Sequence, residues 1–399
     1  MARHSRVLDS IFKSALYAWR HTYMFVAGRI NGITPDKVVF SSFQSYAYND
    51  NPRYVSEKLH ELAPEIKQVW LLRGARTGAE RIPDYVTIVD PETRRGLREL
   101  ATARVWVDNV QKNQNLLFRP GVQAYFNTWH GDRGFKRVGK DNTHQNFKPR
   151  TERFCTAMIA GSEFGMRTYR TAFEFEGPVL MDGCPRNDLL ISDDREFASR
   201  LRFEMGLPED DGLVLYAPTF RDDETIARQR VQIDLSQTLD MLEAKTGRSW
   251  LCLYRAHYRS QGLAIEREDP RFRDLNAWPE MAELLLVSDL IVTDYSSCAG
   301  DFILRNKPAI LFQPDMADYE QGSRELYVDM ASSPFYIARD MNGMQTIIND
   351  LSEEGIRENC RQWRAFFGVT ETGHASEALA RCIIEVIRKS NMSNQEVKT

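Results

Sequence analysis

A histidine followed by a run of basic residues offers the clearest chemistry in this sequence. In "WHGDRGFKRVGKD", His130 ends the apolar run "AYFNTW", and Arg133, Lys136, Arg137 and Lys140 follow it closely. Neighbouring cations disfavour a protonated imidazole, which would suit His130 as a general base near pH 7. The structural alternative is a strand-end histidine bonded to a backbone carbonyl, beside a solvated basic loop.

The same stretch also resembles a nucleotide-binding P-loop. From Gly134 it reads "GFKRVGKD", which fits G-x-x-x-x-G-K-[ST] at every position but the last. The residues between the glycines are bulky and cationic, so backbone N–H groups have little room to close on a phosphate. Asp141 stands where a hydroxyl is needed, and no apolar helical period follows it. We therefore reject an NTP-binding loop.

A second phosphate-binding pattern lies in "LIVTDYSSCAGDF". Leu290–Thr293 reads as a buried strand, Asp294–Ser297 as a turn, and the residues from Cys298 as a helix. The hydroxyls of Ser296 and Ser297, with free N–H groups at a helix N-terminus, would bind phosphate. A plain N-cap is the alternative, but one serine would satisfy it, so the doubled serine favours a phosphate contact.

Other basic and polar groups follow predicted strands and would share one edge with this turn. A lone arginine or histidine after a strand is usually structural, but together these groups could neutralise a diphosphate. They are Arg255, His257 and Arg259 in "LYRAHYR", Thr219 and Arg221 in "APTFRDD", and Arg186 and Asp188 in "DGCPRNDLL".

Missing motifs narrow the function further. The sequence has no D-x-D, so a metal-clamped diphosphate is not indicated, and we expect no metal and no cofactor. It also lacks G-x-G-x-x-G and G-x-S-x-G, which argues against dinucleotide oxidoreductases and α/β-hydrolases.

The elements that position these groups alternate between strands and helices, which predicts an α/β fold with parallel sheets. A chain of 399 residues favours two domains of roughly 150–200 residues. We place one lobe at residues 36–192 and the other at 193–388, with a linking stretch over 193–211 and a polar tail at 389–399. Two such lobes put a cleft between the carboxyl ends of their strands, where ligands bind.

Bulk composition limits the partners and the compartment. The net charge of -4 does not suggest nucleic-acid binding. The six cysteines lie far apart without a C-x-x-C pair, which favours a reducing compartment. No apolar stretch reaches the roughly 18 residues of a membrane span, and basic residues interrupt the N-terminal apolar run, unlike in a signal peptide.

The first 35 residues predict an amphipathic helix. Apolar residues including Phe12, Leu16, Trp19 and Tyr23 recur at steps of three and four, and five Lys/Arg residues stand against the single Asp9. A basic, aromatic helix is typical of contact with an anionic membrane, so we predict a peripheral location on the cytoplasmic face of the membrane. Packing on the protein's own core is the alternative.

Several of these segments together resemble the CDP-glycerol glycerophosphotransferase family, whose members build teichoic acids and related polymers. The resemblance runs from about residue 38 to residue 378, and W-H-G, A-P-T-x-R-D and T-D-Y-S-S occur in this order. Its segments are "SSFQSYAYNDNPRYVSEKL", "VWVDN", "NTWHGDRGFKRVGKD", "DGCPRNDLL", "LYAPTFRDD", "YRAHYR" and "ELLLVSDLIVTDYSSCAGDFILRNKPAILFQPDMADYE".

The resemblance implies a GT-B-like fold, CDP-glycerol as donor and no catalytic metal. It implies that the first lobe binds a lipid-linked acceptor and the second binds the donor. Motif matching makes His130 the candidate base. It places His257, Ser296 and Ser297 at the donor phosphates, together with further motif positions at Arg221, Arg255, Asp294 and Asp301.

Two departures from the family pattern leave the substrate open. The family often has Thr-Pro after W-H-G, where this chain has Asp132 and Arg133, and it often has Pro after R-x-H, where Tyr258 stands. CDP-ribitol as donor and a capsule polymerase therefore remain alternatives. So do a nucleotide-sugar glycosyltransferase of the same fold and a non-catalytic member that only binds.

Overall fold

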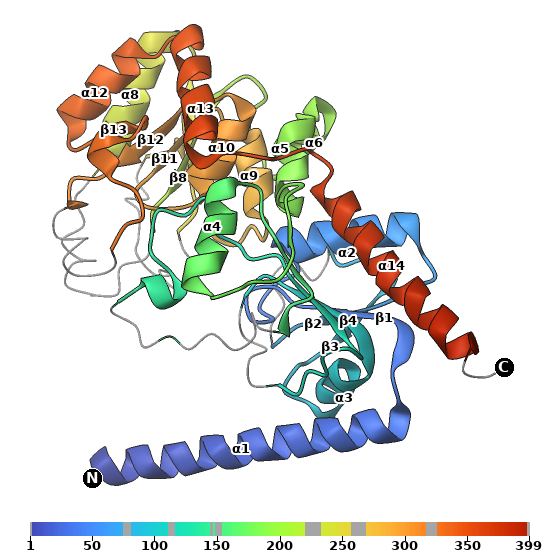
Figure 1. The fold of residues 1–399 in the computed structure, drawn as a ribbon. Coiled ribbons are helices and arrows are strands. Elements are labelled where there is room, and N and C mark those ends of the chain that lie inside the picture. Colours follow the sequence, from blue (N-terminus) through green and yellow to red (C-terminus); the bar gives the residue numbers. More distant parts are fainter. Residues whose placement is uncertain are drawn as a thin grey trace.

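The chain forms two α/β lobes, each built on a parallel sheet (Figure 1). The structure is a computed structural model that describes residues 2–74, 81–110, 116–143, 147, 154–219, 233–256, 269–316 and 325–396, with side chains from residue 12 to residue 390. The first sheet contains β1 (Thr34–Phe40), β2 (Lys67–Leu71), β3 (Val86–Val89), β4 (Ala103–Asp108), β5 (Ala124–Asn127), β6 (Ala157–Ile159) and β7 (Val179–Leu180). The second contains β8 (Gly212–Ala217), β9 (Trp250–Tyr254), β10 (Phe272–Asp274), β11 (Leu290–Thr293), β12 (Ala309–Phe312) and β13 (Tyr336–Ala338).

The two sheets share one topology. Their strand orders are β3-β2-β1-β4-β5-β6-β7 and β10-β9-β8-β11-β12-β13. In each sheet the order reverses between the first and fourth strand of that sheet, β1 beside β4 and β8 beside β11. Ligands bind at this reversal in open parallel sheets, because the connections there leave in opposite directions and open a crevice.

Helices cover both faces of each sheet. They are α1 (Ala2–Asn31), α2 (Asp50–Leu62), α3 (Arg94–Thr102), α4 (Glu163–Ala172), α5 (Asp188–Ser192), α6 (Arg195–Glu204), α8 (Leu235–Thr246), α9 (Met281–Val287), α10 (Cys298–Phe302), α12 (Met341–Asp350), α13 (Glu353–Phe367) and α14 (Ala375–Glu396). Short 3-10 turns lie at Gly139–Asp141, Pro185–Asn187, Ile303–Arg305 and Met330–Ser332.

Alternation along the strands assigns side chains to the two faces. In β1, Val38 and Phe40 face a core shared with α2 and α14, whereas Val39 faces a core shared with α1 and α3. This follows from the two-residue period of a strand. Because both faces are buried, the strands read as nearly continuous apolar runs, which is why the sequence predicts them well.

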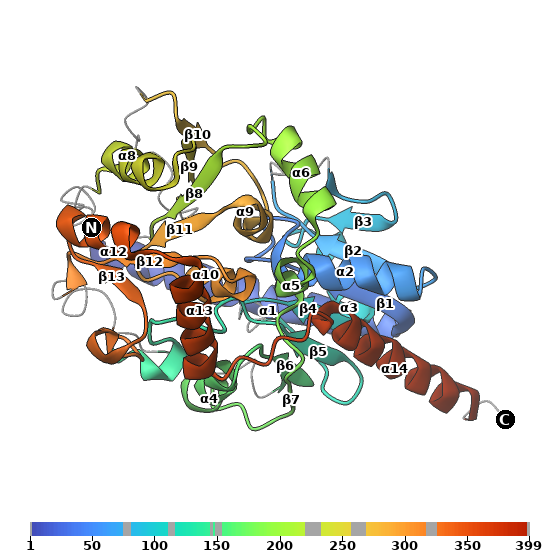
Figure 2. The ribbon, with the colours of Figure 1, turned by 90° about the horizontal axis from the view of Figure 1, so that it is seen from above.

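Two segments cross from one lobe to the other and correct the predicted domain boundaries. The final helix α14, which we predicted to belong to the second lobe, packs on the first, beside α2 (Figures 1 and 2). Its Leu379 and Ile383 are buried in the core of the first lobe. The helix also continues to Glu396, through most of the predicted polar tail. The predicted linking stretch contains α6.

In the other direction, the loop after His130 reaches into the second lobe. Phe135 is fully buried in the core of that lobe, with ring centroids 5.3 Å from Phe335 and 6.0 Å from Trp363. The backbone extends the contact, since the N–H of Tyr327 donates to the carbonyl of Phe135 at 2.7 Å. Each lobe therefore completes part of its core with a segment of the other.

Replacing Phe135 with alanine should destabilise the protein by about 3–5 kcal/mol, the usual cost of removing a buried phenylalanine. The urea midpoint of unfolding measures the loss. The matched control is Phe203→Ala, because Phe203 is 85% exposed and should change stability by less than about 0.5 kcal/mol. Equal losses in the two variants would show that Phe135 does not anchor the loop in the second lobe.

The N-terminal helix α1 has a packed half and an exposed half. Met24 and Ala27 are 1% and 7% exposed and lie in the core with α3, as the structural alternative predicts. Toward the N-terminus the helix runs past the lobe (Figure 1), and Phe12 and Trp19 are 70% and 40% exposed. Arg20 pairs with Glu92, so one of the five positive charges counted in this segment is neutralised within the protein.

Candidate active site between the two lobes

His130 lies at the carboxyl end of the first sheet, next to the strand reversal. It follows β5, and its Nδ1 lies 2.7 Å from the carbonyl oxygen of Asn109, which directly follows β4. The rings of Phe43 and Trp129 contact the imidazole, with centroids 5.3 and 4.5 Å away. Within the described ranges, no hydrogen bond engages Nε2 of this half-buried side chain, so that nitrogen can accept a proton.

The electrostatic surroundings keep His130 neutral. Burial is the main cause that lowers its pKa below the usual value, and the charge of Arg186 lowers it further. The Asn109 carbonyl and the charge of Asp50 act in the opposite direction. The shift has the direction that a general base needs, but its main cause is burial rather than the basic loop invoked from the sequence.

Carboxylates pair with most of the cations of that loop. Arg137 pairs with Glu325 at 3.2 Å, and Lys140 pairs with Glu174. Arg133 is fully buried, so it is not a solvated loop residue. The prediction that these cations surround the imidazole is therefore wrong for the described contacts.

Arg133 forms the centre of a buried ion-pair network that joins the lobes. Its guanidinium donates to Glu371 at 2.8 Å, to Asp301 at 2.5 Å and to Asp132 at 3.2 Å. Asp132 in turn accepts from Ser162, the residue that caps α4. Asp132 and Arg133, where the family pattern departs, are thus structural residues of the interface between the lobes.

Asp301 belongs to the same interface rather than to the donor. One of its oxygens accepts from Arg133 and Asn187, and the other accepts two bonds from Arg186 at 2.9 and 3.1 Å. Burial raises the pKa of Asp301, but the charges of Arg186 and Arg133 outweigh burial and hold it below the usual value. These contacts occupy the carboxylate, so we reassign Asp301 from donor binding to the joining of the lobes.

Arg186 and Asp188, predicted to line the phosphate edge, are also occupied. Arg186 pairs with Asp301 and with Asp50, the latter at 3.2 Å. Asp188 accepts from the backbone N–H groups of Ala375 and Ser376 at the start of α14.

The turn after β11 is shaped by Asp294. Its Oδ1 accepts from the N–H groups of Thr219 and Tyr295 at 2.9 and 2.6 Å, which ties the ends of β8 and β11 together. Asp294 therefore builds the turn, whereas Ser296 and Ser297 are half-buried at its tip. The N–H of Cys298 approaches the Ser296 hydroxyl at 3.5 Å, and Ser297 makes no capping bond with its side chain.

The loop that carries His130 lies against this turn. A methyl group built on Gly131 would lie 4.0 Å from the Ser297 hydroxyl, and one on Gly134 would lie 3.8 Å from the Ser297 Cβ. A methyl group on Gly300 would lie only 2.8 Å from the Arg133 Cβ, so glycine is required there for the lobes to meet. The structure thus brings W-H-G and T-D-Y-S-S together across the lobes.

Arg221, His257 and Arg259 lie outside the described residues. Arg255 is described: it follows β9, its guanidinium donates to the carbonyl of Asn276, and burial lowers its pKa.

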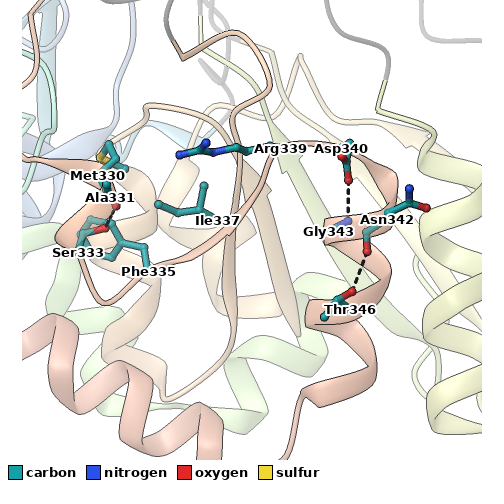
Figure 3. A pocket seen from close by; sticks show the side chains of 10 residues that line it. All are labelled: Met330, Ala331, Ser333, Phe335, Ile337, Arg339, Asp340, Asn342, Gly343 and Thr346. Atoms are coloured by element: carbon teal, nitrogen blue, oxygen red, sulfur yellow. Dashed lines mark hydrogen bonds between the residues drawn. The ribbon is translucent and has the colours of Figure 1, made fainter.

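A cavity of about 580 Å³ opens at the same edge of the second sheet, beyond β13 (Figure 3). Arg339, which follows β13, and Ile337 project between the Met330–Phe335 segment and the start of α12. Asp340 caps α12 by accepting from the N–H of Gly343 at 2.7 Å. β13 lies two strands from β11, roughly 10 Å along the edge, so this cavity is beside the Asp294 turn rather than part of it.

Glu280 is a buried carboxyl at the interface of the lobes that no sequence motif indicated. It accepts from the N–H of Asp50 at 2.8 Å, and Arg53 approaches it at 3.9 Å. Burial, with the nearby charges of Asp50 and Glu283, raises the pKa of Glu280 to about 7 although Arg53 opposes the shift.

This raised pKa predicts a pH-dependent stability. A glutamate with a folded-state pKa above its unfolded value stabilises the fold below about pH 4.5, and this contribution is lost as the pH rises through about 7. Since one pKa unit corresponds to about 1.4 kcal/mol, wild type should lose on the order of 2–3 kcal/mol more than Glu280→Gln between pH 4.5 and pH 8. Urea unfolding of both proteins across this range tests it, and parallel curves would contradict the assignment.

Sequence reasoning missed the residues that surround His130. Asn109 and Asp50 lie in "VWVDN" and "SSFQSYAYNDNPRYVSEKL", which carried the resemblance without a role. The position of Asn109 in the sequence could have indicated its importance, because it directly follows β4, one of the two strands at the reversal.

The two lobes, each built on a parallel sheet with a matching strand order, define a GT-B-like architecture, as predicted. The chain belongs to the CDP-glycerol:poly(glycerophosphate) glycerophosphotransferase family, whose profile matches residues 23–385. The predicted resemblance is therefore confirmed.

Individual relatives agree with this membership. The teichoic acid glycerol-phosphate transferase of Staphylococcus aureus (strain NCTC 8325 / PS 47) is 26% identical over 87% of this chain and 92% of its own length. The teichoic acid poly(glycerol phosphate) polymerase of Bacillus subtilis (strain 168) is 30% identical over 73% of this chain but only 40% of its own length. The chain likewise spans 48% of the corresponding polymerase of Staphylococcus epidermidis (strain ATCC 35984).

The fold also matches a solved structure. The wall teichoic acid polymerase TagF superimposes with a TM-score of 0.82 over 98% of both chains, at 24% sequence identity.

Two further features concern metals and membranes. The described side chains contain no group of three or more His, Cys, Asp or Glu residues arranged to hold a metal ion. None of the helices in the described part of the chain combines the length and the apolar character needed to cross a bilayer.

Proposed function

We propose that this chain transfers glycerol phosphate from CDP-glycerol to a hydroxyl of a lipid-linked acceptor and releases CMP, in the synthesis of teichoic acid or a related cell-surface polymer. The observation that carries the proposal is the placement of a neutral, half-buried His130 beside the Ser297 turn of the other lobe. Family membership supports CDP-glycerol as the donor.

The proposed reaction is a direct phosphoryl transfer. The acceptor hydroxyl oxygen forms a bond to the β-phosphorus, and its proton moves to Nε2 of His130. The bond between that phosphorus and the bridging oxygen breaks, and CMP leaves with the electron pair. The barrier falls mainly through positioning and charge stabilisation, which we assign to Ser296, Ser297 and Arg255, with Arg221 and His257.

CMP release tests the proposal. CDP-glycerol, CDP-ribitol and UDP-glucose are offered with a prenyl-diphosphate disaccharide acceptor, with and without EDTA. Acceptor-dependent CMP from CDP-glycerol that EDTA does not reduce is the expected result. CMP release from CDP-ribitol alone would mean that the enzyme transfers ribitol phosphate and not glycerol phosphate. UDP from the sugar alone would identify a glycosyltransferase, and donor binding without any release would identify a non-catalytic member.

We further propose that the exposed half of α1 holds the enzyme peripherally on the cytoplasmic face of an anionic membrane, near its acceptor. Phe12, Tyr17 and Trp19 are exposed there beside Lys13, as interfacial helices require.

Replacing Phe12, Tyr17 and Trp19 with serine should reduce co-sedimentation with phosphatidylglycerol vesicles. Substitution is preferable to deleting the helix, because Met24 and Ala27 belong to the core and their loss would disturb the fold. Phe203→Ser is the control, since it removes one exposed aromatic side chain from another helix, α6. Unchanged sedimentation of the triple variant would exclude α1 as the anchor.

A further inference from the structure

Hydrogen bonds hold the side chain of Asn109 in a single position next to His130. Its Oδ1 accepts from the N–H of Phe43 at 2.9 Å, and its Nδ2 donates to the Ser42 hydroxyl at 3.1 Å and to Asp50 at 2.9 Å. Asn109 is 0% exposed, so no water competes for these bonds. Three contacts from two segments thus fix the residue whose carbonyl meets the imidazole.

The neighbouring backbone is strained, which is common where a structure fixes reactive groups. Of the eight described residues other than glycine with a positive φ, three contact His130 or Asn109 and two more directly follow Phe43 in the chain. They are Phe43, Gln44, Ser45, Asp50 and Trp129, with φ between 40° and 68°. Such conformations are energetically unfavourable for residues with a Cβ atom and persist only where the surroundings enforce them. Two of these residues, Phe43 and Trp129, contact the His130 ring directly.

The Asn109 carbonyl decides which nitrogen of His130 carries the proton. A carbonyl oxygen only accepts hydrogen bonds, so a nitrogen 2.7 Å away must donate. A neutral imidazole has a single N–H, and with that hydrogen on Nδ1 the lone pair lies on Nε2.

We propose that Asn109 is a positioning residue that selects the Nδ1-protonated tautomer of His130 and thereby leaves Nε2 as the base. The step that this tautomer serves rests on the proposed function, but the tautomer itself does not. Asn109 acts through His130, without touching the acceptor, and its side-chain bonds to Ser42, Phe43 and Asp50 hold the carbonyl in position.

Nitrogen-15 NMR of the ring nitrogens tests the proposal directly. The protein contains seven histidines, and His130→Ala identifies the signal of His130 by its loss. At a pH where the ring is neutral, wild type should show a protonated Nδ1 and an unprotonated Nε2. A proton on Nε2 would overturn the proposal.

Two variants test the part played by the side chain. Asn109→Ala should give a mixture of tautomers and a kcat about 10–100-fold lower, the cost of a small misplacement of a reacting group, with KM for the donor nearly unchanged. The control is Asn359→Ala on α13. It removes another buried side-chain amide, one that donates to the carbonyl of Pro334. It should keep the wild-type tautomer and kcat.

If Asn109→Ala fails to fold, Ser42→Ala removes one of the three bonds and should give a smaller change of the same kind. Wild-type tautomer and kcat in the folded variants would overturn the proposal. An Nδ1-protonated His130 in an enzyme that releases no CMP would support the proposed tautomer and reject the proposed function. CMP release by an enzyme with the proton on Nε2 would support the function and overturn the tautomer.

Discussion

Replacing His130 with alanine should reduce acceptor-dependent CMP release by about 10²–10⁴-fold, the usual cost of losing a general base. The acceptor hydroxyl would lose the group that takes its proton, while the groups that we assign to the donor phosphates would remain. Affinity for CDP-glycerol should therefore be nearly unchanged. Single-turnover CMP release measures the rate, and isothermal titration with CDP-glycerol measures the affinity.

His60→Ala is the matched control for this variant. His60 lies near the C-terminal end of α2, half-buried, with its ring centroid 3.6 Å from that of Tyr85. Asp50, which lies near His130, is at the opposite end of this helix. It should release CMP at the wild-type rate. Similar rates in the two variants, or a His130→Ala enzyme that keeps most of its rate, would remove His130 from the role of base.

Replacing Arg133 with methionine should destabilise the protein by about 3–5 kcal/mol, because it leaves buried carboxylates without their partner. Methionine keeps much of the length of the side chain, so the loss reports mainly on charge. Asp301 and Glu371 are 5% and 1% exposed at the side chain, and neither can regain water without separating the lobes. Urea unfolding measures the change.

Arg137→Met is a control from the same loop. Arg137 and its partner Glu325 are each 41% exposed at the side chain, so breaking this pair should cost no more than about 1 kcal/mol. Adding Glu371→Gln to Arg133→Met should recover part of the loss, since it removes one uncompensated charge. If the double variant is no more stable than the single one, the ion-pair network does not account for the loss.

The sequence predicted the architecture better than the site. Buried parallel strands give apolar runs, so the sequence predicted the alternation of strands and helices, and the strand predicted at Leu290–Thr293 is β11. The strands β6, β7, β10 and β13 have at most three residues each, too few for a periodic pattern, and they were missed.

Within the site, sequence adjacency was misleading for charged residues. The basic residues after His130 look alike in the sequence, but only the fold decides that Arg133 is buried while Arg137 stays half-exposed. The partners Asp301 and Glu371 lie 168 and 238 residues away, beyond any local pattern. The place of His130 near a strand end was predictable because the apolar run before it forms β5, whereas its role as a base stays a prediction.

The exchange of segments between the lobes has a consequence for synthesis on the ribosome. Chains emerge from their N-terminus, and domains usually fold in the order in which they appear. Here the core of the first lobe needs Leu379 and Ile383 of α14, which are made after all the strands of the second lobe. The first lobe must therefore wait, with part of its apolar face uncovered, until the whole second lobe has left the ribosome.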